Sequence, residues 1–104
     1  MRLRKIRFGE DQMVELARMA DAFAHPARVE IFRHILSSNR QRQLVRNKDL
    51  VEALPYSQAT VSQHVSKLVT GGFLTARPQG TSVCYYANVG CVTKFMDGIS
   101  RLGK

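Results

Sequence analysis

The side chains best suited to chemistry in this sequence lie between residues 59 and 70, where hydroxyl and amide groups recur and no carboxylate is present. Val61, Val65 and Leu68 share the spacing of one helix face, so the stretch predicts a helix with a single apolar stripe. At about 100° of rotation per residue, the remaining polar and small side chains point away from that stripe or flank it. These outward residues are Ala59, Thr60, Ser62, Gln63, Ser66, Lys67 and Thr70. Such a small, polar face is what an element entering a DNA groove needs.

Two helices joined by a tight turn would position these side chains. Ser57 is the expected N-cap of the outward-facing helix, and the glycine pair 71–72 ends it, since glycine adopts the left-handed C-terminal conformation without strain. A shorter helix before it begins at an Asn47 cap and stops ahead of Pro55, which disfavours helical geometry in the preceding residue. The stretch therefore predicts a helix-turn-helix with a recognition helix over about 57–70.

The distribution of charge favours contact with a polyanion. The formal net charge is +8 and the sequence pI is near 10.2, which is typical of nucleic-acid binders. No Asp or Glu occurs between Ala53 and Met96, whereas an ordinary solvated helix carries charges of both signs. The alternative interpretation is a pair of helices that serves packing alone.

Length and composition predict one domain. With 104 residues, 44% of them hydrophobic, the chain can bury one modest core. We expect a basic arm over residues 1–9 and a single domain over 10–104. There is no apolar run long enough to span a bilayer and no signal-peptide pattern at the start, so we expect a cytoplasmic protein without a membrane partner.

Three further helices are expected around the helix-turn-helix. Pro26 suits the first turn of a central core helix, because its missing N–H costs nothing there. The helices over about 10–24 and 90–102 carry apolar residues on broad faces, which predicts contact with a second subunit. The apolar residues of the last helix are Val92, Phe95, Met96, Ile99 and Leu102.

A β-hairpin is expected over about 73–87, where two β-prone runs flank a turn containing proline and glycine. A hairpin that follows a helix-turn-helix forms a wing, and Arg77, Gln79 and Thr81 near its tip are candidate DNA contacts. The connection over 40–46 is compatible with a short strand edge. The cationic residues Arg46 and Lys48 are candidate phosphate contacts, with a solvated loop as the alternative.

In this order and spacing, four segments resemble the ArsR/SmtB family of bacterial winged-helix repressors. They are ADAFAHPARVEIFRHIL, DLVEAL, SQATVSQHVSKLVTGGFL and QGTSVCYYAN. The resemblance implies a homodimer built from the first and last helices, which binds an imperfect palindromic operator in double-stranded DNA and leaves it when an inducer binds. It also implies a base-reading role for Ser57, Gln58, Thr60, Ser62 and Gln63. The inducer remains unknown.

The sequence departs from the family pattern at both familiar metal sites. Arg46 and Lys48 occupy the places of a Cys-x-Cys pair, and cations cannot ligate a metal. The last helix has Asp97 as its only acid and has no histidine. We therefore expect no metal site and no cofactor. His25-Pro26 replaces the usual Asp-Pro, which leaves the expected fold unchanged.

Two cysteines remain as possible sensor groups. Cys84 falls on a predicted strand, and Cys91 falls near the N-terminus of the last helix, where the helix dipole would favour a thiolate. A disulfide between them would couple the wing to the dimer helix and make a redox-responsive repressor. The alternative is a packed strand residue and an ordinary free thiol. His64 is expected to serve packing and hydrogen bonding.

Other function classes have little support. The sequence has no glycine-rich phosphate loop, no nucleophile motif and no clustered carboxylates, so we do not expect an enzyme. The sequence predicts a mainly α winged helix-turn-helix of about five helices and a two-stranded wing, acting as a sequence-specific regulator. The remaining alternative is an architectural or protein-binding module without promoter specificity.

Overall fold

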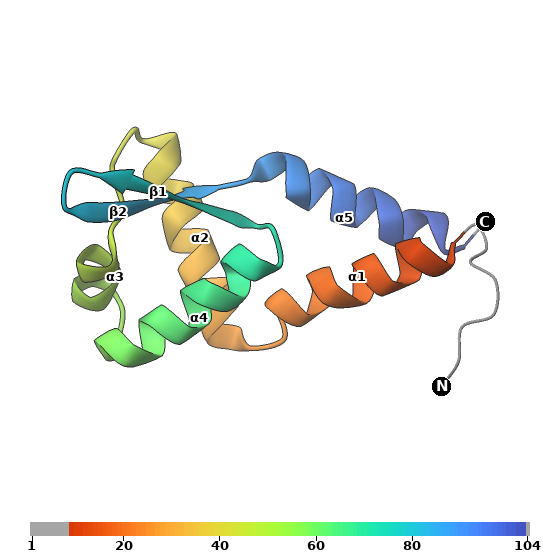
Figure 1. Cartoon of the computed structure of the whole chain (residues 1–104), viewed down its shortest axis with the longest axis horizontal. Coiled ribbons are helices and arrows are strands. Elements are labelled where there is room, and N and C mark those ends of the chain that lie inside the picture. The colour runs from red at the N-terminus through yellow and green to blue at the C-terminus, as the bar shows by residue number, and fades with distance from the viewer. Residues whose placement is uncertain (1–8, 104) are drawn as a thin grey trace.

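The computed structural model describes residues 9–103 and confirms five helices and one antiparallel hairpin (Figure 1). In chain order these are α1 (Glu10–Ala22), α2 (Pro26–Arg40), α3 (Asn47–Ala53), α4 (Gln58–Thr70), β1 (Leu74–Gln79), β2 (Ser82–Ala87) and α5 (Val89–Arg101). The first helix ends two residues before the predicted boundary. Except for Gly9, the predicted basic arm lies outside the described residues.

Local capping explains most helix starts. The Nδ1 atom of His25 accepts a hydrogen bond from the Ala27 N–H at 3.0 Å, with Pro26 in the first turn of α2. Ser57 Oγ accepts the Thr60 N–H at 3.2 Å, as predicted for the recognition helix. The predicted Asn47 cap is wrong, because Arg46 is the N-cap of α3. Asp49 then accepts the Arg46 N–H at 2.8 Å.

The end of α4 uses its two glycines for different reasons. Gly72 has a φ of 90°, the left-handed geometry that was predicted. The backbone of Gly71 has the right-handed helical conformation, so glycine is not needed there for its φ angle. Glycine is needed there for space, because a Cβ atom at this position would lie 2.6 Å from the Cβ of Ala22. A side chain at 71 would therefore push α1 away from the end of the recognition helix.

The core lies beneath α4, between α2, α3 and the start of the hairpin. Phe73 is fully buried at its centre, with its ring centroid 4.5 Å from that of Phe23, 6.2 Å from that of Phe32 and 5.9 Å from that of Phe95. Residues of α2, α3 and α4 complete this core, namely Ile31, Ile35, Leu50, Val61, Val65 and Leu68. The apolar stripe predicted for α4 therefore faces inward.

The hairpin is joined to the rest of the fold along one side. Its two strands pair antiparallel from Leu74 opposite Ala87 to Gln79 opposite Ser82. Arg46 forms an isolated bridge with Cys84, and the Tyr85 N–H donates to Val45 O at 2.9 Å. The connection before α3 thus contributes a short strand edge, and this holds the hairpin beside the helix-turn-helix.

Helices α1 and α5 lie side by side and project away from the core (Figure 1). They approach closely at Gly98, where a Cβ atom would meet Leu16 Cδ2 at 2.6 Å. Both helices expose large apolar side chains, with exposed fractions from 47% to 64%. These are Met13 and Val14 on α1, Val89, Met96 and Ile99 on α5, and Leu102 at its end. The α1/α5 pair thus leaves an apolar surface open to solvent.

Candidate nucleic-acid interface

The solvent face of α4 is built from the polar residues that the periodicity places there. Val61, Val65 and Leu68 are buried, whereas Thr60 is half-buried. The remaining residues of the predicted set are exposed, namely Ser57, Gln58, Ala59, Ser62, Gln63, Ser66, Lys67 and Thr70. Hydroxyl, amide and ammonium groups therefore point outward from a helix without a carboxylate.

Side-chain hydrogen bonds orient several of these hydroxyls. Ser57 Oγ donates to Thr60 Oγ1 at 3.0 Å, and Asn47 Nδ2 donates to Ser62 Oγ at 3.0 Å. Because Asn47 occupies an acceptor position of the Ser62 oxygen, the Ser62 hydroxyl hydrogen can point elsewhere. Sequence reasoning had assigned Asn47 to the cap of α3 and missed this contact, which joins residues 15 positions apart.

The hairpin, α3 and the N-terminal end of α4 lie together at one end of the molecule, opposite the free ends of α1 and α5 (Figure 1). An open hollow of about 390 Å³ joins them and is lined by Arg46, Asn47, Lys48, Gln58, Ser62, Ser82, Val83 and Tyr85. The structure therefore brings the predicted cationic residues next to the recognition helix. Arg77, Gln79 and Thr81 are exposed on the hairpin, around Gly80, whose φ of 63° makes the turn.

Arg46 differs from the other candidate contacts because it already has a partner. Its Nε atom lies 3.2 Å from Asp49 Oδ2, in an ion pair that is about one third exposed on each side. The backbone hydrogen bond from Arg46, followed by its side chain, lowers the pKa of Asp49, so this acid stays ionised. A phosphate would have to compete with this carboxylate for Arg46. Lys48 is exposed, so it is the better candidate for phosphate contact.

His64 lies on the inward flank of α4, as expected for a packing and hydrogen-bonding residue. Its ring centroid is 4.6 Å from that of His25, and its Nδ1 atom is 3.2 Å from Arg28 Nη1. Arg28 also donates to the carbonyls of Ala22 at 2.8 Å and Asp21 at 3.2 Å. A single guanidinium therefore joins the end of α1 to the middle of the recognition helix, and no sequence pattern indicates it.

We expect the stability of the protein to fall as the pH drops below 6.5, partly because of His64. Burial first, then the charges of His25 and Arg28, lower the pKa of His64 below its ordinary value of 6.5. The unfolded chain therefore binds more protons than the folded chain between these two pKa values, and stability is lost as pH falls through that window. Imidazole shifts in an NMR titration should give a His64 midpoint below 6.5.

Urea unfolding at pH 7.5 and at pH 5.5 checks the consequence. The wild-type protein should lose more stability between the two pH values than the His64→Gln variant does. A His64 midpoint at or above 6.5 would contradict this assignment.

The two cysteines differ in their surroundings. Both thiols are free, and Cys84 is buried in the sheet opposite Arg77. Burial raises the pKa of the Cys91 thiol and outweighs the attraction of Lys94 and Arg18, which favours the alternative of an ordinary free thiol over a thiolate. Cys91 Sγ instead lies 3.9 Å from Gly71 O, as a weak donor at the end of α4.

Within residues 9–103, no three His, Cys, Asp or Glu side chains come close enough together to hold a metal ion. Over the same range, the helices are too short or too polar to cross a lipid bilayer.

A helix-turn-helix followed by a β-hairpin defines the winged helix-turn-helix class, and within that class the chain has the fold of the ArsR-family transcriptional regulators. An ArsR-like regulator from Rhodococcus sp. RHA1 matches with a TM-score of 0.78 at 22% identity, over 89% of this chain and 83% of that one. The homodimeric DNA-binding domain of a possible ArsR-family regulator from Mycobacterium bovis matches with a TM-score of 0.73 at 21% identity, over 92% of this chain and 84% of that one. NolR from Sinorhizobium fredii matches with a TM-score of 0.67 at 21% identity, over 96% of each chain.

The resemblance inferred from the sequence segments is thus confirmed at the level of the fold. No family model matches the sequence. No curated protein matches it either.

Proposed function

We propose that this chain is a homodimeric, sequence-specific DNA-binding regulator of transcription that acts as a repressor in the cytoplasm. The observation that carries the proposal is the exposed face of α4, which presents hydroxyl, amide and ammonium groups without a carboxylate. This helix lies beside a hairpin without acids and a hollow whose lining residues include no acid, although Arg46 in that lining is paired with Asp49. A protein surface that approaches phosphates must exclude carboxylates, whereas a merely solvated helix has no such need.

Most acids of the chain lie on the elements that project away from the hairpin, which supports the same orientation. Five of the eight are on α1 and α5, namely Glu10, Asp11, Glu15, Asp21 and Asp97, whereas Asp49 and Glu52 lie on α3. DNA attracted by the net charge of +8 would therefore meet α4 and the wing before it met α1 and α5.

The exposed apolar surface of the α1/α5 pair supports a dimer. Exposed apolar patches on soluble proteins commonly mark interaction sites. The similar domain from Mycobacterium bovis is described as homodimeric. A twofold dimer would place one α4 in each of two major grooves, with half-sites about one helical turn or a small multiple apart, on an imperfect palindrome. Binding at such a site would block a promoter that overlaps it.

The proposal is tested by fluorescence anisotropy with the DNA upstream of the chain's own gene and with scrambled DNA, across a salt series. A specific regulator should prefer one sequence by roughly 10³-fold or more. Equal affinity for both, vanishing steeply with salt, would instead support an architectural or protein-binding module.

Gln63 and Lys67 should separate base reading from phosphate contact. Gln63→Ala should relax the sequence preference by about 1 to 3 kcal/mol, because an amide that pairs with a base edge is lost. Lys67→Ala should weaken binding to all sequences alike and lower the salt slope by about one. Equal losses on operator and scrambled DNA in both variants would refute these roles.

A further inference from the structure

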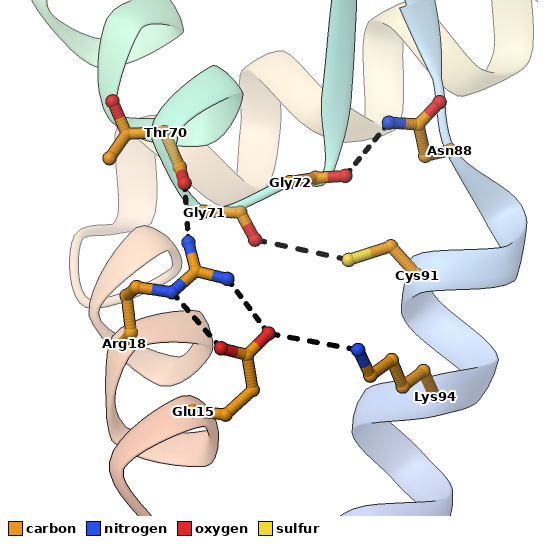
Figure 2. A network of polar contacts seen from close by, with 8 residues as sticks. All are labelled: Glu15, Arg18, Thr70, Gly71, Gly72, Asn88, Cys91 and Lys94. Atoms are coloured by element: carbon orange, nitrogen blue, oxygen red, sulfur yellow. Dashed lines mark hydrogen bonds and ion pairs between the residues drawn. The ribbon is translucent and has the colours of Figure 1, made fainter. Parts of the chain in front are cut away.

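The C-terminal end of α4 is held by side chains from both helices of the α1/α5 pair. Figure 2 shows the carbonyls of Thr70, Gly71 and Gly72 lying between α1 and α5. Arg18 Nη1 of α1 donates to Thr70 O. Cys91 Sγ of α5 lies 3.9 Å from Gly71 O, and Asn88 Nδ2 donates to Gly72 O at 2.8 Å. The last carbonyls of a helix lack partners within it, so external donors are needed here.

Of the three donors at the C-terminal end of α4, Arg18 is the one that carries a full positive charge. The C-terminus of a helix bears a partial negative charge, and a cation near it is stabilising. The Arg18 side chain is aimed by Glu15, whose carboxylate oxygens accept its Nη2 at 2.8 Å and its Nε at 3.3 Å. The same carboxylate lies 3.8 Å from Lys94 Nζ on α5. Figure 2 thus shows polar contacts that link Lys94 of α5 through Glu15 and Arg18 of α1 to the last carbonyl of α4.

We infer that Arg18 is a positioning residue that couples the tilt of the recognition helix to the placement of the α1/α5 pair. This inference rests on the proposed function. It adds Arg18, which lies outside the DNA-facing surface, to the residues on which sequence discrimination depends. The contact joins positions 52 residues apart in the chain.

The geometry of α4 explains why its C-terminal end matters for contacts at its other end. Thirteen helical residues span about 20 Å at 1.5 Å per residue. A tilt of about 10° at Thr70 would therefore move Ser57 by roughly 3 Å. Direct hydrogen bonds tolerate only a few tenths of an ångström, so base contacts would be lost while contacts to phosphates could readjust.

A loss of this kind should appear in DNA discrimination rather than in folding. Arg18 and Glu15 are 44% and 38% exposed, and exposed ion pairs contribute little to stability. The inward stripe Val61, Val65 and Leu68 is buried, so we expect it to keep α4 on the core without them. Removing the Arg18 donors would therefore loosen the orientation of a helix that remains folded.

The test compares Arg18→Met with Arg101→Met, which makes the same change in charge and shape. Arg101 pairs with Asp97 of its own helix at 3.0 Å, with both side chains more than half exposed. For each variant, the affinity for an operator selected from random DNA by the wild-type protein is divided by that for scrambled DNA. Thermal unfolding and the dimer mass are measured on the same samples.

We expect Arg18→Met to lower this ratio about tenfold relative to Arg101→Met, with both variants folded and dimeric. Arg18→Lys, which keeps one cationic donor, should recover part of the ratio. Glu15→Gln should lower the ratio in the wild-type background and have no effect in the Arg18→Met background, because Glu15 acts through Arg18.

Equal ratios for Arg18→Met and Arg101→Met would overturn the inference. It would also fall if the loss in Arg18→Met came with monomers or with unfolding, because Arg18 would then serve assembly or stability. A wild-type protein without any sequence preference is a different result, since it refutes the proposed function itself.

Discussion

The Ile99→Asp variant should be a monomer that binds the operator at least about 100-fold more weakly than the wild-type protein. Ile99 lies on the exposed apolar surface of the α1/α5 pair, where it is 47% exposed. In a twofold interface each substitution occurs twice, so two uncompensated carboxylates would be buried near each other. A monomer reaches one half-site only, and the gain from linking two half-sites is typically 10²- to 10⁴-fold.

Val29→Asp is the matched control, because Val29 is 49% exposed but lies on α2 and does not belong to the exposed apolar surface of the α1/α5 pair. It introduces the same charge and should leave the protein dimeric. Sedimentation gives the mass of each variant, and anisotropy on full and half operators gives its affinity. An Ile99→Asp dimer with unchanged operator affinity would place the interface elsewhere.

The Phe73→Ala variant should lose about 3 to 5 kcal/mol of folding free energy. Phe73 is fully buried and packs edge-on against Phe23, Phe32 and Phe95. Truncating such a ring removes transfer free energy and leaves a cavity that rigid neighbours cannot fill. Small domains are stable by about 5 to 15 kcal/mol, so a large share of the total would be lost.

Phe95→Ala is the comparison for this prediction, because the Phe95 ring is only half-buried. Urea unfolding at one fixed protein concentration keeps any dimer contribution comparable between variants. The loss for Phe73→Ala should exceed that for Phe95→Ala. A loss below about 1 kcal/mol at Phe73 would mean that the three rings are not packed as a rigid cluster.

Features that depend on neighbouring residues could be predicted from the sequence. The period of Val61, Val65 and Leu68 predicted both the helix and its buried face, and the structure confirms both. Ser57 caps that helix as expected. The hairpin also forms where two β-prone runs flank a turn. Periodicity, capping and turns act over a few residues, so their physics is present in the local sequence.

Other predictions failed because the deciding partner is distant in the chain. Asn47 was assigned a local cap, yet it donates to Ser62 on the next helix. The sequence left a thiolate and an ordinary thiol open at Cys91, and burial against the end of α4, which raises the pKa of this thiol, favours the ordinary thiol. The apolar residues of α1 also divide between core and solvent: Met19 is buried, and Met13 is 54% exposed.

The sequence alone therefore determined the class of fold, the recognition helix and the side chains on its solvent face, because periodicity and capping depend on adjacent residues. Only the tertiary structure decided how that helix is held. Arg28 joins it to the end of α1, and Arg18 holds its last turn from a position 52 residues away. An arginine side chain can serve any nearby carbonyl or carboxylate, so its partner is known only once the fold has placed them together.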